Sequence, residues 1–144
     1  MNNELPKFDL PVDFVATDEV PVTLLQSYAR FPCKIKACLF ILCTRGEVRA
    51  TVNLAKQAIR AGDFVTLLPN SFIQIEHISN DIRLYVAGFS GEFMARSNYL
   101  KLVVDYFYTI LQHPSLTLPP RIVRLYEAAY TLLLRTYAMS RLEH

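Results

Sequence analysis

The sequence predicts a mainly β domain with some α, in which a small double-sheet barrel or sandwich precedes two antiparallel helices. Three observations support this fold class. Short apolar runs separated by turn residues occupy residues 35–89. After Phe89 the apolar residues recur at steps of three and four, which is typical of helices. The length of 144 residues suits one domain with a buried core.

We expect four segments along the chain. Residues 1–22 carry three prolines and form an N-terminal arm, extended and with little helix. The β portion follows at residues 23–90, and a helical region at residues 91–141. Residues 142–144 read Leu-Glu-His and match the start of a common polyhistidine tag, so we expect a tag remnant there. A longer protein would then continue beyond Arg141.

Composition and charge exclude several classes of protein. The chain is 52% hydrophobic and 19% charged, which is too apolar for disorder, and no apolar run approaches the roughly 18 residues of a membrane span. A net charge of +2 does not by itself indicate a nucleic-acid-binding protein. The N-terminus lacks the basic start and apolar core of a signal peptide, and cysteines are few. We expect a reduced, cytoplasmic protein in which Cys33, Cys38 and Cys43 are small buried residues.

The first strands are expected to form a hairpin over residues 35–54. Residues 44–47 form its turn, and apolar residues then alternate with polar ones, which indicates a strand with one buried face. The apolar positions of that strand are Val48, Ala50, Val52 and Leu54. Further strands are expected at residues 64–68, 72–78 and 82–89.

Two helices are expected after the strands. The first runs from Ser97, a residue suited to a helix start, to His113. Its apolar positions are Leu100, Val103, Phe107 and Ile110. A proline-rich loop at residues 114–119 follows, and Pro120 begins the second helix, where proline fits the first turn.

The second helix carries two adjacent apolar stripes, although a helix on a monomer needs only one. The first stripe consists of Ile122, Leu125, Ala129, Leu132, Thr136 and Met139. The second stripe consists of Val123, Tyr126, Tyr130, Leu133 and Tyr137. Either the helix is wedged between elements of its own domain, or the first stripe packs on a second copy of the chain. We expect a homodimer through the first stripe.

The two helices are not typical of a DNA-reading helix-turn-helix. That motif joins short helices by a turn of three or four residues, whereas the link from His113 to Pro120 is long and proline-rich. The second helix is also apolar around most of its surface. We therefore expect no direct DNA binding by this chain.

Three stretches, LCTRGEVRATVN, AIRAGDFVTLLPNSFIQIEH and YVAGFS, resemble in order and spacing the N-terminal cupin-like sensor domain of AraC-type bacterial transcription regulators. The resemblance covers roughly residues 25–141. It implies a cupin-like β-barrel that senses a small molecule and dimerises. It also implies a separate DNA-binding module, which is absent from this chain.

The metal signature of cupin enzymes is missing from the matching positions. Such enzymes carry a glycine, a proline and then a histidine, and these places fall on Gly62, Pro69 and Gln74. Glutamine is not a usual ligand of catalytic iron, manganese or zinc. The preceding stretch, residues 33–39, contains neither histidine nor glutamate. We expect no metal, no cofactor and no enzymatic activity.

The resemblance implies that the ligand contacts Arg45, in the stretch TRG where sugar-binding members place an arginine. The forked donors of arginine suit hydroxyls or a carboxylate, so a sugar or an organic acid is the expected effector. Gln74 and Tyr85 are expected to add hydrogen bonds, and Phe8 or Phe14 of the arm to act as a lid. The alternative is that Arg45 is a solvated charge at a hairpin end.

Three functional hypotheses remain open. The first is an effector-sensing and dimerisation domain of a transcription regulator. The second is a cupin enzyme, which would need a metal. The third is a ligand-free dimerisation module, whose interior would be filled by large side chains such as Phe40, Phe64, Phe72 and Leu84. Ile75, standing where a sugar-stacking aromatic is expected, weakens the sugar assignment.

Overall fold

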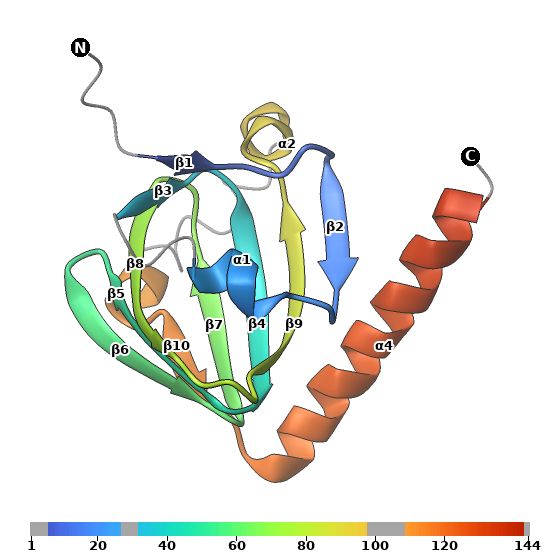
Figure 1. Cartoon of the computed structure of the whole chain (residues 1–144). Coiled ribbons are helices and arrows are strands. Elements are labelled where there is room, and N and C mark those ends of the chain that lie inside the picture. The colour runs from blue at the N-terminus through green and yellow to red at the C-terminus, as the bar shows by residue number, and fades with distance from the viewer. Residues whose placement is uncertain (1–5, 27–31, 98–108, 143–144) are drawn as a thin grey trace.

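The computed structural model describes residues 6–26, 32–97 and 109–142, without the side chains of residues 24 and 138–142. The described part is mainly β, with helices at its periphery (Figure 1). The elements are β1 (Lys7–Phe8), β2 (Phe14–Thr17), α1 (Val22–Gln26), β3 (Cys33–Ile35), β4 (Cys38–Arg45), β5 (Glu47–Val52), β6 (Ala55–Arg60), β7 (Asp63–Leu67), β8 (Ser71–Ile78), β9 (Arg83–Phe89), α2 (Gly91–Arg96), β10 (Ser115–Thr117) and α4 (Pro120–Leu142).

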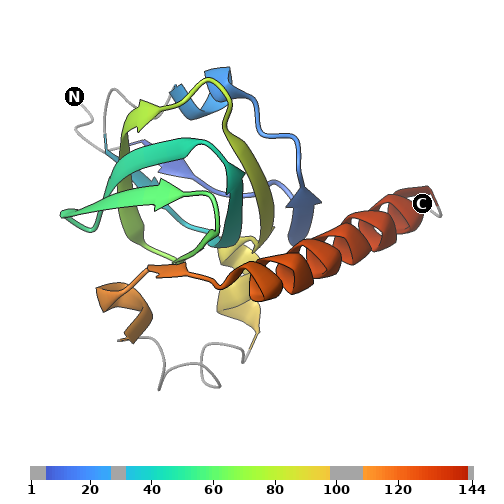
Figure 2. The ribbon, with the colours of Figure 1, turned by 90° about the horizontal axis from the view of Figure 1, so that it is seen from below.

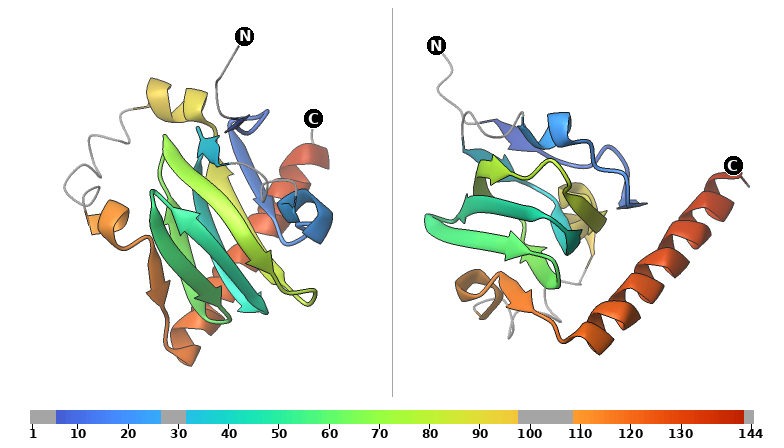
Figure 3. Two further views of the ribbon diagram at one scale, coloured as in Figure 1. Left: turned by 60° about the vertical axis from the view of Figure 1, so that its left-hand side comes forward. Right: turned by 60° about the horizontal axis from the view of Figure 1, so that its bottom comes forward.

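The described strands form two five-stranded sheets rather than one closed barrel. The first sheet has the strand order β1-β3-β8-β5-β6, and the second has the order β10-β7-β4-β9-β2. The sheets face each other, and α4 lies along the outer side of the second sheet (Figures 1 and 3). The mainly β, double-sheet prediction is therefore confirmed, as a sandwich.

The core lies between the sheets, where alternating side chains meet. In β5, Val48, Ala50 and Val52 are buried while Arg49 is exposed, as the alternation predicts. β4 is apolar at successive positions, without the alternation of β5, because both of its faces are covered. Its Cys43 belongs to the core between the sheets, and its Leu42 packs beneath α4.

The predicted hairpin over residues 35–54 is wrong. β4 pairs with β7 and β9 in the second sheet, whereas β5 pairs with β6 and β8 in the first. The chain changes sheets at Gly46, where φ is +83° and a Cβ would collide with Ser79 Oγ. Alternation had identified the buried face of β5 but carries no information on which strand lies beside it.

The hairpin lies one strand later, between β5 and β6. Its turn residues Asn53 and Leu54 both have positive φ, +49° and +72°, which matches the twist of a two-residue hairpin. Leu54 is 95% exposed, so it ends the alternating pattern rather than continuing it.

The Pro69-Asn70 turn also carries the chain from one sheet to the other, because β7 belongs to the second sheet and β8 to the first. Asn70 adopts φ +71°, and its N–H donates to the carbonyl of Ile35 at 2.6 Å. The turn therefore joins the two layers and ties them to the end of β3.

The N-terminal arm takes part in both sheets. β1 pairs in parallel with β3, and β2 pairs antiparallel with β9 at the edge of the second sheet. Extended backbone was expected in this segment, but its integration into the sandwich was not. The pairing places the arm directly across one side of the space between the sheets (Figure 1).

The region between β9 and α4 differs from the expected loop and helix. Ser90 caps α2, and Ser97 is the C-cap of this helix. Residues 98–108, with Leu100, Val103 and Phe107, lie outside the described residues, and residues 109–112 are helical. The two antiparallel helices are thus not established. The proline-rich loop contains a strand, β10, because residues 115–117 pair with the free edge of β7.

α4 is a single helix, as predicted, and its second stripe packs on the second sheet. Tyr130 is buried, stacks on Tyr85 at 5.4 Å and donates its hydroxyl to the carbonyl of Phe40 at 2.7 Å. Tyr126 meets Phe64 edge to face at 5.0 Å. Burial raises the pKa of Tyr130 well above its usual value, so the hydroxyl stays a donor over the physiological range.

Replacing Tyr130 with phenylalanine is expected to lower the free energy of unfolding by about 1–2 kcal/mol, because the Phe40 carbonyl loses a buried partner. Chemical denaturation followed by circular dichroism measures this. Tyr126→Phe is the control, with a smaller loss expected because that side chain is only half-buried and keeps its ring packing. Equal losses in both variants would show that the Tyr130 hydrogen bond does not anchor the helix.

Candidate ligand-binding pocket

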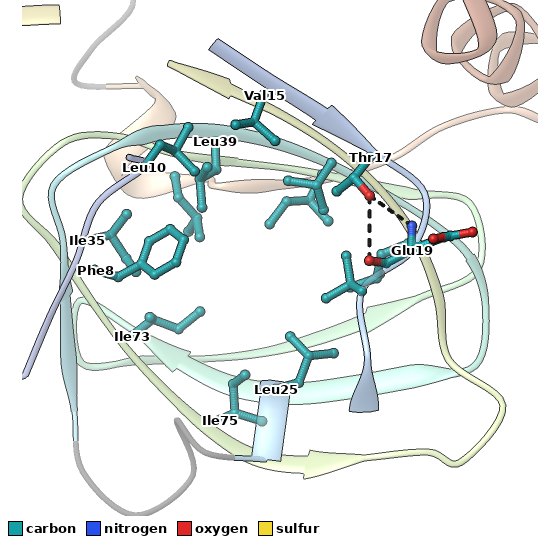
Figure 4. Close-up of a pocket in the computed structure, with 15 residues that line it drawn as sticks. Phe8, Leu10, Val15, Thr17, Glu19, Leu25, Ile35, Leu39, Ile73 and Ile75 are labelled. Atoms are coloured by element: carbon teal, nitrogen blue, oxygen red, sulfur yellow. Dashed lines mark hydrogen bonds between the residues drawn. The ribbon is translucent and has the colours of Figure 1, made fainter. Parts of the chain in front are cut away.

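A pocket of about 270 Å³ opens between the two sheets (Figure 4). Of the fifteen described residues that line it, thirteen are aliphatic or phenylalanine, and the other two are Thr17 and Glu19. The apolar lining residues are Phe8, Leu10, Val15, Val20, Leu25, Ile35, Leu39, Ile41, Leu67, Ile73, Ile75, Leu84 and Val86.

The two-residue period of the strands sets the lining on each side. On β8, Ile73 and Ile75 turn inward while the intervening side chain turns outward. On β9, Leu84 and Val86 face the pocket, and Tyr85 faces α4. Strands of both sheets thus contribute most of the walls, and Leu10, Glu19, Val20 and Leu25 reach the space from segments between strands.

The arm supplies the remaining wall and the polar end of the pocket. Phe8 and Leu10 lie on one side and Val15 on another (Figure 4). At the polar end, the N–H of Glu19 donates to Thr17 Oγ1 at 3.0 Å, and that hydroxyl is 3.5 Å from the Glu19 carbonyl. The carboxylate of Glu19 is exposed and points away from the pocket (Figure 4). Closing the site therefore depends on residues 8–20.

Residues 26–140 match the family model of the AraC-like ligand binding domain. The chain belongs to this family. The match confirms the resemblance found in three stretches of sequence, and it assigns the chain to the regulatory sensing domains of transcription regulators. No curated protein matches the chain in sequence.

In this AraC-like domain, one predicted ligand contact lines the pocket, namely Phe8 of the arm. Phe14 lies on the opposite face of β2 and packs against Phe89 at 5.3 Å and Tyr137 at 6.2 Å. Tyr85 stacks on Tyr130 beneath α4. The structure therefore does not bring the two arm phenylalanines and Tyr85 together.

The two polar residues predicted as ligand contacts lie outside the pocket lining. Arg45 is exposed at the end of β4, opposite Arg83 in register. Gln74 is half-buried on β8 and pairs in register with Thr51, on the side away from Ile73 and Ile75. Their contact with an effector stays a prediction that the pocket geometry does not support.

The large side chains considered as fillers of the interior mostly lie elsewhere. Phe40 and Phe64 stack on each other at 6.4 Å on the face that meets α4, and Phe72 is 40% exposed. Leu84 alone of the four lines the pocket. The space between the sheets therefore remains available to a small molecule.

The three cysteines are buried, as predicted for small core residues. Burial raises the pKa of Cys38 and of Cys43 to about 11, and that of Cys33 also rises. Protonated thiols of this kind are poor nucleophiles and poor metal ligands. Within residues 6–26, 32–97 and 109–142, no three His, Cys, Asp or Glu side chains gather in a metal-binding arrangement. No helix in that part of the chain is both long and apolar enough to cross a membrane.

Sequence reasoning missed most of the pocket residues. Val15 and Thr17 fall in the segment predicted as an extended arm outside the β portion, although their spacing of two is that of a strand with one inward face. Ile75 was considered only as the aliphatic residue at an expected aromatic position, and Ile73 carries no marker of a site, because a pocket wall and a packed core use the same side chains. The two-residue alternation of β8 and β9 is the signal that could have found four of the fifteen lining residues, namely Ile73, Ile75, Leu84 and Val86.

Proposed function

We propose that this domain senses a small-molecule effector in the apolar pocket and passes its occupancy to a second copy of the chain through α4. The observation that carries the proposal is the pocket itself, which lies between the sheets of an AraC-like ligand binding domain. The protein would be a cytoplasmic, non-enzymatic homodimer that contacts DNA only through a module outside this chain. Residues 23–90 would form its sensing part and residues 91–141 its dimerisation part.

Strand β2 offers a direct link between the pocket and α4. Val15 and Thr17 face the pocket, whereas Phe14 and Ala16 face the other way because successive side chains alternate. Phe14 meets Tyr137 of α4 edge to face, and Ala16 is buried. One strand thus contacts both the effector site and the helix (Figure 1).

An effector shifts such a system only by its differential affinity for two placements of β2. Coupling free energies between two sites are typically about 1–3 kcal/mol, which corresponds to roughly 5- to 150-fold changes in affinity. The packing of a single aromatic pair is of this order. The contact between Phe14 and Tyr137 is therefore large enough to carry the signal.

The first stripe of α4 supports a dimer. Leu125 and Leu132 are 64% and 66% exposed, Ala129 and Thr136 are exposed, and Ile122 is half-buried. The side chain of Met139 lies outside the described residues. The helix also projects beyond the sandwich at its C-terminal end (Figure 2). An exposed leucine stripe on a helix whose other stripe already packs on its own domain fits a second copy.

The effector prediction is tested by a thermal-shift screen of sugars, organic acids, aromatic metabolites and aliphatic molecules. At a hundredfold excess over Kd, a ligand of this pocket is expected to raise Tm by about 5–10 °C. Val86→Phe places a ring in the pocket and is expected to lose the shift. Val12→Phe makes the same exchange at an exposed site and is expected to keep it. No shift with any class would favour the ligand-free dimerisation module.

The dimer prediction is tested by sedimentation velocity. Leu125→Asp and Leu132→Asp are each expected to convert dimers into monomers, because a carboxylate would be buried without a partner. Arg124→Asp introduces the same side chain at an exposed position off the stripe and is expected to stay dimeric. Dimers in both leucine variants would place the interface elsewhere.

The link through β2 is tested by hydrogen–deuterium exchange on α4. With the molecule that raises Tm most in the screen, the wild type is expected to gain amide protection over residues 120–137. Phe14→Leu is expected to bind that molecule while losing most of the added protection, since the contact with Tyr137 is removed. Phe93→Leu alters another aromatic neighbour of Phe89 and serves as the control. Full protection in Phe14→Leu would rule out this route.

A further inference from the structure

We propose that the effector is an uncharged aliphatic molecule of medium length with a single hydroxyl or carbonyl group. This inference rests on the proposed function and names the ligand class of the same pocket. It differs from the sugar or organic acid that the sequence resemblance implies. The geometry points to an alkyl chain between the sheets with its oxygen at the Thr17 end.

The walls of the pocket argue against charged and polyhydroxy ligands. Among the described lining residues none is cationic, and the one carboxylate, that of Glu19, points away from the pocket. A ligand carboxylate would therefore lose its hydration without a charged partner. A sugar would bury several hydroxyls against aliphatic side chains, each without a hydrogen-bond partner.

Thr17 carries the one hydroxyl among the described side chains that line the pocket. Its Oγ1 accepts from the Glu19 N–H at 3.0 Å, which fixes the oxygen in place. Its own proton is directed at the Glu19 carbonyl over 3.5 Å, which is a long and weak hydrogen bond. A ligand oxygen can take that proton with little loss. One hydroxyl or carbonyl oxygen on the ligand matches this single donor.

The pocket volume sets the size of the ligand. About 270 Å³ is slightly below the roughly 300–1,000 Å³ of pockets for drug-sized molecules. A water molecule fills about 30 Å³ in the liquid, and a methylene group is similar in size, so the pocket accepts roughly nine such groups. A chain of about eight carbons with one oxygen fits this measure.

Isothermal titration calorimetry at pH 7 with the primary alcohols from hexanol to octanol tests the inference. Octanoate and arabinose represent the alternative ligand classes, charged and polyhydroxy molecules. Each added methylene is expected to lower Kd by about fourfold. Octanoate is expected to bind at least about tenfold more weakly than octanol, because its charge finds no partner. Val86→Phe is expected to abolish octanol binding, and Val12→Phe to retain it, which separates pocket binding from surface adsorption.

The polar end is tested with threonine variants of matched shape. Thr17→Val is expected to weaken octanol binding by about three- to tenfold, whereas Thr17→Ser keeps the hydroxyl and stays within about twofold of the wild type. Thr44→Val removes a hydroxyl that donates to the Arg83 carbonyl outside the pocket and is expected to change nothing. If Thr17→Val does not fold, Thr17→Ala decides the question by comparison with Thr17→Ser, because these two variants differ only in the hydroxyl.

The outcomes separate this inference from the proposed function. If octanoate or arabinose binds more tightly than octanol, and Val86→Phe abolishes that binding, the proposed ligand class is overturned. The proposal of an effector pocket is then supported. An unchanged affinity in Thr17→Val would overturn the placement of the oxygen. Octanol binding that persists in Val86→Phe would overturn the inference. The absence of binding by every class of ligand would overturn the inference and would also remove support for the proposed function.

Discussion

The two apolar faces of the second sheet are the constraint on which the rest of the structure depends. Leu39, Ile41 and Val86 face the pocket, and Phe40 and Leu42 face α4 from the same strands. A sheet that is buried on both sides needs apolar residues at successive positions, which is why β4 reads as a continuous run. The candidate pocket and the helix are consequently separated by the thickness of one sheet.

The sequence was sufficient for the positions of β5, β7, β8, β9 and α4, and insufficient for strand neighbours. Alternation in β5 identifies its buried face, but pairing depends on where the chain crosses between layers, as it does at Gly46. β10 was missed because three residues between prolines carry no periodic signal, and only the free edge of β7 gives them a partner. Local patterns therefore define the elements, and tertiary pairing decides their arrangement.

The site was harder to predict than the fold for a related reason. Sequence reasoning favours polar residues such as Arg45 and Gln74 as site residues, because a polar side chain has few structural explanations and a functional one is readily assigned to it. An apolar pocket has no such marker, since Ile73 and Leu84 would look the same in a filled core. Phe8 was identified through its place in the arm. What distinguishes pocket from core is the packing of residues from six or more elements, which no short window of sequence contains.

The position of β2 in the second sheet favours the sensing role proposed for it. It is four residues long and lies at the sheet edge, with β9 as its one partner strand among the described elements. Short edge elements open at low free-energy cost, so contacts on their two faces weigh heavily in their stability. A ligand against Val15 and the helix against Phe14 would then both act on the local opening equilibrium of β2. A central strand such as β4, held by hydrogen bonds on both sides, would resist both.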